Sequence, residues 1–243
     1  MHEELKKRIT ELAARAEERG YYIYTEFLSP SGICAAEELR LPVERFAFGG
    51  ADFCERKMLR FGSFGYDEPF PLSIIKISPA GEKFFKAMTH RDYLGALMSL
   101  GIERDRVGDV FTDGKTAYAV IASSLTEHVV SGLDRVGGNS VRCSVVSEIP
   151  LEYAPKAESV RVSVASLRLD ALLSRVYGLS RDGGAELIRA GSVFVNGRLC
   201  ESAGYTPKEG ETITVRGYGK LQYCEISGTS SKGRLFVTVK RYK

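Results

Sequence analysis

The 243-residue sequence contains no tryptophan, three histidines and five scattered cysteines. None of the cysteines forms a Cys-x-x-Cys pair and the histidines lack metal-ligand spacing, which argues against a disulfide framework and a structural zinc site. No apolar run reaches the roughly 18 residues that a membrane span needs, and residues 1–20 lack the apolar stretch of a secretory signal. The nucleophile pattern Gly-x-Ser-x-Gly and the dinucleotide pattern Gly-x-Gly-x-x-Gly are also missing. We therefore expect a cytoplasmic, monomeric protein that is not an enzyme, needs no cofactor and does not bind membranes.

Charge is distributed unevenly along the chain. Residues 160–243 contain 14 Lys and Arg against 7 Asp and Glu, whereas residues 1–159 contain 20 against 24. The net charge of +3 therefore combines a C-terminal balance of +7 with a balance of −4 in the rest. This asymmetry favours contact between the C-terminal part and a polyanion, although many basic faces are merely solvated.

Apolar spacing predicts three regions and a linker. Residues 3–19 have the periodicity of an amphipathic helix that Gly20 ends, and a less regular stretch follows up to residue 71. Residues 72–150 alternate strand and helix signals in the order β-α-β-β-α-β, which is the order of the ferredoxin-like (RRM-like) split βαβ fold. Residues 151–160 contain Pro155 and several charges, so we predict a linker there and a separate domain at 161–243.

The C-terminal pattern is the most informative part of the sequence. Apolar residues at helical spacing predict a helix that begins near Leu169 and ends at Gly178, and Ser180 is then placed to cap a second helix ending at Gly191. A short strand, the tight turn Asn196-Gly197 and an alternating strand at 212–216 follow. The ordered set consists of Arg168-Leu169-Asp170, Ser180-Arg181, Leu187-Ile188, Gly191, Val193, Val195-Asn196-Gly197 and Gly210-Glu211 with Ile213 and Val215.

This set resembles the S4 (alpha-L) RNA-binding domain over about 50 residues. The resemblance implies two short helices on a small sheet, with arginines that bind phosphates of structured RNA. The helix N-terminus at Ser180 would add backbone donors and a positive dipole end. Gly183 and Gly184 depart from the family pattern, and we expect alanine at either position to stabilise the second helix by roughly 0.5–1 kcal/mol.

Two further strings resemble the bacterial YlmH-type family, whose members carry a C-terminal S4 domain. One runs from Gly49 to Lys57, and the other runs from His90 to Ile102 and is followed by Arg104 and Val107-Gly108-Asp109-Val110; the segment from Glu26 to Pro30 adds to the resemblance. This resemblance implies binding to the ribosomal large subunit, with rRNA or tRNA contact, in ribosome-associated quality control of stalled nascent chains. The alternatives are an RNA-modifying enzyme that uses an S4-like module for its substrate, and an interaction protein linked to cell division.

The predicted architecture is α+β: an N-terminal helical and irregular segment at 1–71, a ferredoxin-like domain at 72–150 and an S4-like domain at 161–243. Each candidate site residue also has a plainer interpretation, as a solvated charge, a helix cap or a turn former. The candidate RNA-binding residues are Arg168, Arg175, Ser180, Arg181, Arg189, Asn196, Gly197, Arg198, His90, Arg91, Arg56 and Lys57.

Overall fold

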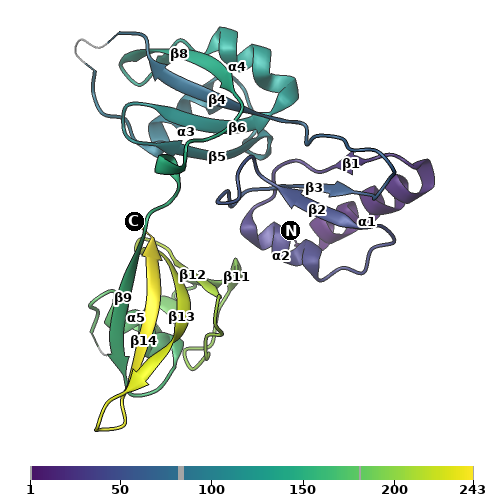
Figure 1. The fold of residues 1–243 in the computed structure, drawn as a ribbon. Helices are drawn as coiled ribbons and strands as arrows, with labels where there is room; N and C mark the ends of the chain where they lie inside the picture. Colours follow the sequence, from purple (N-terminus) through teal and green to yellow (C-terminus); the bar gives the residue numbers. More distant parts are fainter. Residues whose placement is uncertain (1, 82–84, 181, 243) are drawn as a thin grey trace. The chain divides into compact units, whose positions relative to one another are not determined.

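The computed structural model describes residues 2–81, 85–180 and 182–242, and divides the chain into two compact units (Figure 1). The first unit is Met1–Ala154 and the second is Pro155–Lys243. The first contains three apolar clusters, whereas the second is built around one.

The first unit begins with two helices and a three-stranded antiparallel sheet. The elements are α1 (His2–Arg19), β1 (Ile23–Tyr24), α2 (Pro30–Glu37), β2 (Arg45–Phe48) and β3 (Met58–Phe61), with strand order β1-β3-β2. Ile9, Ala13 and Ala16 form the buried stripe of α1, and Gly20, at φ 67°, ends this helix by donating its N–H to the Ala16 carbonyl. The expectation of an irregular stretch up to residue 71 is wrong, because Ile23 pairs with Phe61 and Arg45 also pairs with Phe61.

The middle of the chain has the predicted ferredoxin-like order. Its helices and strands are β4 (Leu72–Pro79), α3 (His90–Ser99), β5 (Val107–Thr112), β6 (Ala117–Ala122), α4 (Thr126–Gly132), β7 (Arg135–Val136) and β8 (Asn139–Val146). Short 3-10 turns occupy Arg104–Arg106, Ser123–Leu125 and Leu151–Tyr153. The strand order is β5-β6-β4-β8-β7, with β4 antiparallel to both neighbours, so the split βαβ topology is present with the two-residue β7 added at one edge.

The second unit is a six-stranded antiparallel sheet with two short helices. The elements are β9 (Ala157–Val164), α5 (Leu169–Val176), α6 (Gly183–Arg189), β10 (Val193–Val195), β11 (Arg198–Leu199), β12 (Thr212–Val215), β13 (Gly219–Thr229) and β14 (Leu235–Tyr242). The strand order is β11-β10-β12-β13-β14-β9. Residues 157–160 therefore lie in an edge strand, which corrects the linker predicted at 151–160.

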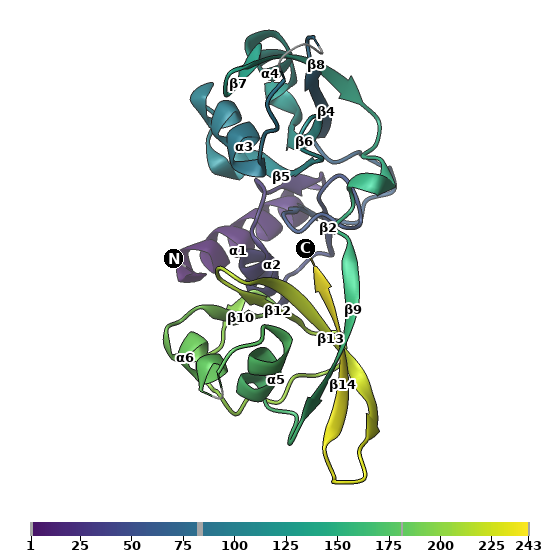
Figure 2. The ribbon, with the colours of Figure 1, turned by 90° about the vertical axis from the view of Figure 1, so that its left-hand side faces the viewer.

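One face of this sheet packs against the helices. Leu169, Leu172 and Leu173 of α5 are fully buried and belong to the same apolar cluster as Val237 and Val239 of β14. The two helices lie on the same side of the sheet (Figure 2). The candidate arginines are therefore carried by helices that are fixed to the sheet by apolar packing.

Candidate nucleic-acid interface

The first helix of the S4-like pattern separates its apolar and charged residues. Leu169, Leu172, Leu173 and Val176 are buried, whereas Arg175 in the last turn is exposed. Arg168 precedes the helix in extended conformation, at φ −111° and ψ 144°. The helix therefore leaves both arginines outside the core.

Arg168 is held by the next acidic residue. Its Nε donates to Asp170 Oδ1 at 3.1 Å and its Nη2 donates to Asp170 Oδ2 at 2.7 Å. The Arg168 side chain stays 51% exposed while that of Asp170 is 17% exposed, and the hydrogen bond from Arg168 lowers the pKa of Asp170. A bidentate pair fixes the plane of the guanidinium, so Asp170 orients Arg168 at the surface.

The second helix starts later than the sequence predicted. It begins at Gly183, after Asp182, and the exposed Ser180 makes no side-chain cap; its backbone carbonyl accepts from the Gly183 N–H at 3.1 Å. The Gly184 N–H donates to the buried Ser174 Oγ at 3.0 Å. The N–H groups of Gly183 and Gly184 therefore have partners within the fold, and phosphate binding at this helix end stays a prediction. Arg181 lies outside the residues that the structure describes.

Gly184 is required by the packing of α6 against α5. A Cβ atom at this position would lie 2.1 Å from the Asp170 carbonyl oxygen and 2.7 Å from Ser174 Oγ. At Gly183 a Cβ would lie 2.9 Å from Leu179 Cβ. The expected stabilisation by alanine is therefore wrong, since Gly184 allows α6 to approach α5 closely and Gly183 leaves room for Leu179 in the connection between them.

The Asn196-Gly197 turn is structural. Both residues have positive φ, 48° and 78°, as a two-residue type I′ hairpin requires. The Asn196 side-chain oxygen accepts from the Thr212 N–H at 2.9 Å, and its own N–H donates to the Thr212 carbonyl at 2.8 Å. The turn thus sets the β10–β11 hairpin against β12 and places the exposed Arg198 on β11.

Four of the candidate arginines are exposed on the helices and hairpin of the second unit. They are Arg168, Arg175, Arg189 and Arg198. Arg189 is in the last turn of α6, where its Nε makes a long 3.4 Å contact with the carbonyl of Ala185 in the same helix. Exposed guanidinium groups on a rigid support can bind phosphate oxygens with little rearrangement.

His90 and Arg91 are exposed residues at the start of α3. The N-cap is Thr89 and not His90, and Asp92 Oδ2 accepts from the Thr89 N–H at 2.7 Å and from its hydroxyl at 2.8 Å. Although the surface of the residue is exposed, neighbouring atoms desolvate the imidazole, and this desolvation, followed by the charge of Arg104, lowers the pKa of His90 from its ordinary value. His90 is therefore mainly neutral at pH 7, and Arg91 carries the positive charge of this helix end.

The Arg56 side chain forms hydrogen bonds with backbone carbonyls of the first unit. Its Nε donates to the Val107 carbonyl at 3.1 Å, and its Nη2 donates to the carbonyls of Phe27 at 2.9 Å and Arg104 at 3.4 Å. Its backbone N–H donates to Asp109 Oδ2 at 2.9 Å. These bonds join the N-terminal part of the first unit to β5, and RNA contact by the Arg56 side chain stays a prediction.

Asp109 and Arg104 complete this junction, and the sequence analysis did not identify their roles. Asp109 also accepts from the Glu55 N–H at 2.5 Å, and burial raises the pKa of Asp109. Arg104 donates to the carbonyls of Val107 and Gly108. The sequence feature that could have indicated these roles is the string Val107-Gly108-Asp109-Val110. In the structure Gly108 lies in tight contact with Phe27, since a Cβ at Gly108 would lie 2.9 Å from Phe27 Cε1.

Lys57 and its neighbour Arg60 are also partly enclosed. Lys57 is half-buried, and its backbone pairs with Leu28 in an isolated bridge. The guanidinium carbon of Arg60 lies 4.5 Å from the ring centroid of Tyr22 and 5.0 Å from that of Phe46. The Arg60 side chain is 14% exposed, so the basic string 56–60 does not form an open cationic patch.

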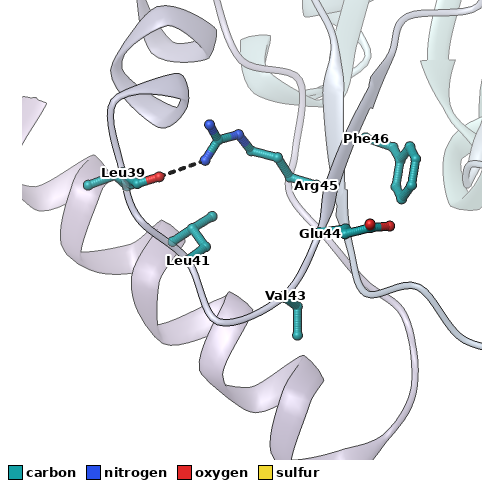
Figure 3. Close-up of a pocket in the computed structure, with 6 residues that line it drawn as sticks. All are labelled: Leu39, Leu41, Val43, Glu44, Arg45 and Phe46. Atoms are coloured by element: carbon teal, nitrogen blue, oxygen red, sulfur yellow. Dashed lines mark hydrogen bonds between the residues drawn. The ribbon is translucent and has the colours of Figure 1, made fainter.

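A shallow hollow of ≈ 560 Å³ lies beside β2 (Figure 3). It is lined by Leu39, Leu41, Val43, Glu44, Arg45 and Phe46. The Arg45 side chain donates to the carbonyls of Leu39 at 2.8 Å and Glu37 at 2.7 Å, where it satisfies acceptors at the end of α2. The hollow therefore offers apolar surface and one carboxylate, with no combination of nucleophile and base.

Across 2–81, 85–180 and 182–242, no group of three or more His, Cys, Asp and Glu residues is arranged to hold a metal ion. Within those ranges, no helix combines the length and the apolar character needed to cross a bilayer.

Two family models match parts of the chain. Residues 66–150 match the model described as "Putative RNA-binding domain in YlmH", and residues 167–213 match the S4 domain. The first range includes His90 and Arg91, and the second includes the exposed candidate residues Arg168, Arg175, Arg189 and Arg198.

Three individual proteins are similar to this chain, each over a different length. The Ribosome-associated protein quality control protein P2 of Bacillus subtilis (strain 168) is 28% identical over 225 residues, which cover 90% of this chain and 87% of that protein. An Uncharacterized RNA pseudouridine synthase of Aquifex aeolicus (strain VF5) is 45% identical over 51 residues, 21% of each protein. The structure of Cell division protein ylmH from Streptococcus pneumoniae aligns with a TM-score of 0.46 and 18% identity, covering 62% of this chain and 92% of that one. The chain therefore matches both the YlmH RNA-binding-domain model and the S4 model, and it is similar along most of its length to a ribosome-associated quality control protein.

Proposed function

We propose that this chain binds the ribosomal large subunit together with tRNA, and acts in quality control of stalled nascent chains. The observation that carries the proposal is the set of four exposed arginines on the elements matched by the S4 domain. The ribosomal assignment is supported by the likeness to the Bacillus subtilis protein, which extends along 90% of this chain.

The second unit supplies the main RNA contact in this proposal. Its helices and hairpin hold Arg168, Arg175, Arg189 and Arg198 at positions fixed by a buried core, which suits a target that is itself rigid. Structured RNA is recognised largely through its shape and its phosphate positions, so spaced arginines with no base-reading pocket are sufficient. The balance of +7 in residues 160–243 adds long-range attraction.

The first unit supplies a second, weaker contact. Arg91, with the neutral His90 beside it, is exposed at the start of α3 within the residues that match the YlmH domain. Two weak sites on one chain strengthen binding when both can reach the same particle, because the second contact forms at a high effective concentration. In this proposal the protein is a cytoplasmic monomer that binds RNA and catalyses no reaction.

The proposal is tested by co-sedimentation of the full chain with purified large subunits, with and without bound tRNA. Replacing Arg175, Arg189 and Arg198 together by glutamine is expected to lower the salt slope of binding by about 3, roughly one for each arginine that no longer binds a phosphate. A matched triple replacement of the exposed Arg8, Arg15 and Arg142 in the first unit removes the same charge and serves as the control. If both variants weakened binding equally, the interaction would depend on overall charge and not on the three arginines of the second unit. If binding were unchanged in both variants, the proposal would be refuted.

A further inference from the structure

The sheet of the second unit has a face that does not pack against α5 and α6. Side chains alternate between the two faces of a strand. On β13 and β14 the buried members are Leu221, Tyr223, Val237 and Val239, all in the cluster under the helices. Lys220, Phe236 and Tyr242, which occupy the alternate positions, therefore lie on the opposite side, together with Arg161 of β9, Phe194 of β10 and Arg216 after β12. We refer to these six residues as the outer sheet face.

Cations and aromatic rings are paired on this face. The guanidinium carbon of Arg161 lies 4.3 Å from the Phe236 ring centroid, and that of Arg216 lies 4.8 Å from the Phe194 centroid. Lys220 Nζ lies 4.9 Å from the Tyr242 centroid. Three such pairs on one sheet face exceed the usual frequency of about one per 70–80 residues.

The Lys220–Tyr242 and Arg216–Phe194 pairs are connected by a row of residues across the strands, whereas the Arg161–Phe236 pair lies further along β14. Tyr242 is in register with Lys220, Lys220 with Thr214, and Thr214 with Phe194. Adjacent strands are separated by about 4.8 Å, so Tyr242 and Phe194, three strands apart, are about 14 Å from each other. An extended ligand crossing the strands would therefore meet a ring, a cation, a hydroxyl and a second ring in order.

The charge of this face specifies the class of ligand. Arg161, Arg216, Lys220 and the exposed Lys240 contribute four cations. Of the two carboxylates within the strands of this sheet, Glu225 is in register with Thr238 on the outer side, whereas Glu158 alternates with Val160 on the helix side. Four cations against one carboxylate, interleaved with rings and with Thr and Gln side chains, suit a polyanion with flat apolar groups and not an apolar protein surface.

We propose that the outer sheet face binds a single-stranded RNA segment, whose bases stack on the ring and guanidinium surfaces while its phosphates contact the same cations. This inference rests on the proposed RNA-binding function and adds a second surface to it. An arginine already held over a ring is pre-organised, and its other side can stack on a base. Arg161, Arg216, Lys220, Phe236 and Tyr242 lie outside residues 167–213 of the S4 match, so the surface is largely separate from the elements that this match covers.

The test uses the full chain, a labelled uridine oligomer of about 12 nucleotides, which falls within the usual site size of sheet-based binders, and an RNA hairpin. Replacing Arg161 and Arg216 by glutamine should lower the salt slope for the oligomer by about 1.4, because each phosphate contact on a single strand contributes roughly 0.7. Tyr242→Leu should weaken oligomer binding by roughly fivefold or more through loss of stacking, and Tyr242→Phe should restore it. Arg142→Gln, on an exposed strand position of the first unit, is the control.

The outcomes separate this inference from the proposed function. Replacing Arg175 and Arg189 should weaken hairpin binding more than oligomer binding. If the variants of the outer sheet face leave oligomer binding unchanged while the helix variants weaken hairpin binding, the second surface is refuted and the proposed function stands. If neither RNA binds the native chain, the proposed function itself fails. If poly-glutamate competes as well as the oligomer at equal charge, the face recognises charge alone and the stacking role is overturned.

Discussion

In the first unit the guanidinium of Arg56 donates to the carbonyls of Phe27 and Val107, whereas in the second unit Arg175 and Arg189 extend from exposed helix positions. Arg104 and Arg60 resemble Arg56 in being held within the fold. Arg104 donates to backbone carbonyls, and Arg60 is enclosed by aromatic rings. All of these arginines lie in or near strings typical of the family. The comparison teaches that arginines in one chain can differ in environment, since some donate to backbone carbonyls within the fold and others extend into solvent.

Arg56→Ala would test the comparison most strongly. We expect it to lower the free energy of unfolding of the first unit by roughly 2–4 kcal/mol, because three carbonyls lose a charged donor. Hydrogen exchange at the β5 amides would report this loss. Arg91→Ala, an exposed arginine in the same unit, should stay within about 0.5 kcal/mol. If Arg56→Ala kept full stability and weakened RNA binding instead, Arg56 would belong with the exposed arginines.

Gly184→Ala tests whether the exposed arginines depend on close helix packing. The added Cβ would overlap the Asp170 carbonyl, so we expect a loss of about 1–3 kcal/mol in the second unit, as for other overpacked sites. Urea denaturation followed by circular dichroism would measure it. Gly204→Ala is the matched control, because its nearest neighbour lies 3.6 Å from the added atom. An unchanged midpoint for Gly184→Ala would mean that α5 and α6 separate without cost.

His90 gives the smallest expected effect and sharpens the contrast with Arg91. Its pKa is below 6.5 in the folded unit, so the unfolded chain binds more protons as the pH falls through that value. Stability should therefore be fully present above about pH 6.5 and decrease toward the lower folded pKa, by less than about 0.5 kcal/mol because the side chain is exposed. His90→Gln should remove this part of the pH dependence. An unchanged pH profile in the variant would show that His90 has its ordinary pKa.

Local signals allowed much of the fold to be predicted. The Asp113-Gly114 and Asn196-Gly197 turns carry positive φ at Gly114, Asn196 and Gly197, and the strands that flank each turn pair as an antiparallel hairpin. The sheet at residues 23–61 was missed because it joins segments nearly 40 residues apart, and its strands are only two to four residues long. Such pairing depends on long-range contacts that no local pattern encodes.

The candidate site could be predicted by residue type but not by environment. The alternation of Val160, Val162 and Val164 is a strand signal, but Pro155 and the neighbouring charges led to the prediction of a linker. Ser180 is a suitable cap residue by type, but the helix begins at Gly183. In this arrangement Gly184 packs closely against the Asp170 carbonyl of α5, a contact that the local sequence does not reveal. Arg56 has no feature of its own that reveals its three carbonyl acceptors, because these come from Phe27, Arg104 and Val107.

The position of β14 between β13 and β9 has a consequence for folding during synthesis. β9 ends at Val164 and its partner β14 begins at Leu235, so about 70 residues must be added before the pair can form. At the usual 5–20 residues per second this takes roughly 4–14 s, during which the edge of β9 stays unpaired. The strands of the first unit all lie between Ile23 and Val146, so that unit can complete its sheets before β14 has been made. A nascent chain of this protein therefore passes through a stage in which one unit is folded and the other is an open strand edge that a chaperone or a second nascent chain could occupy.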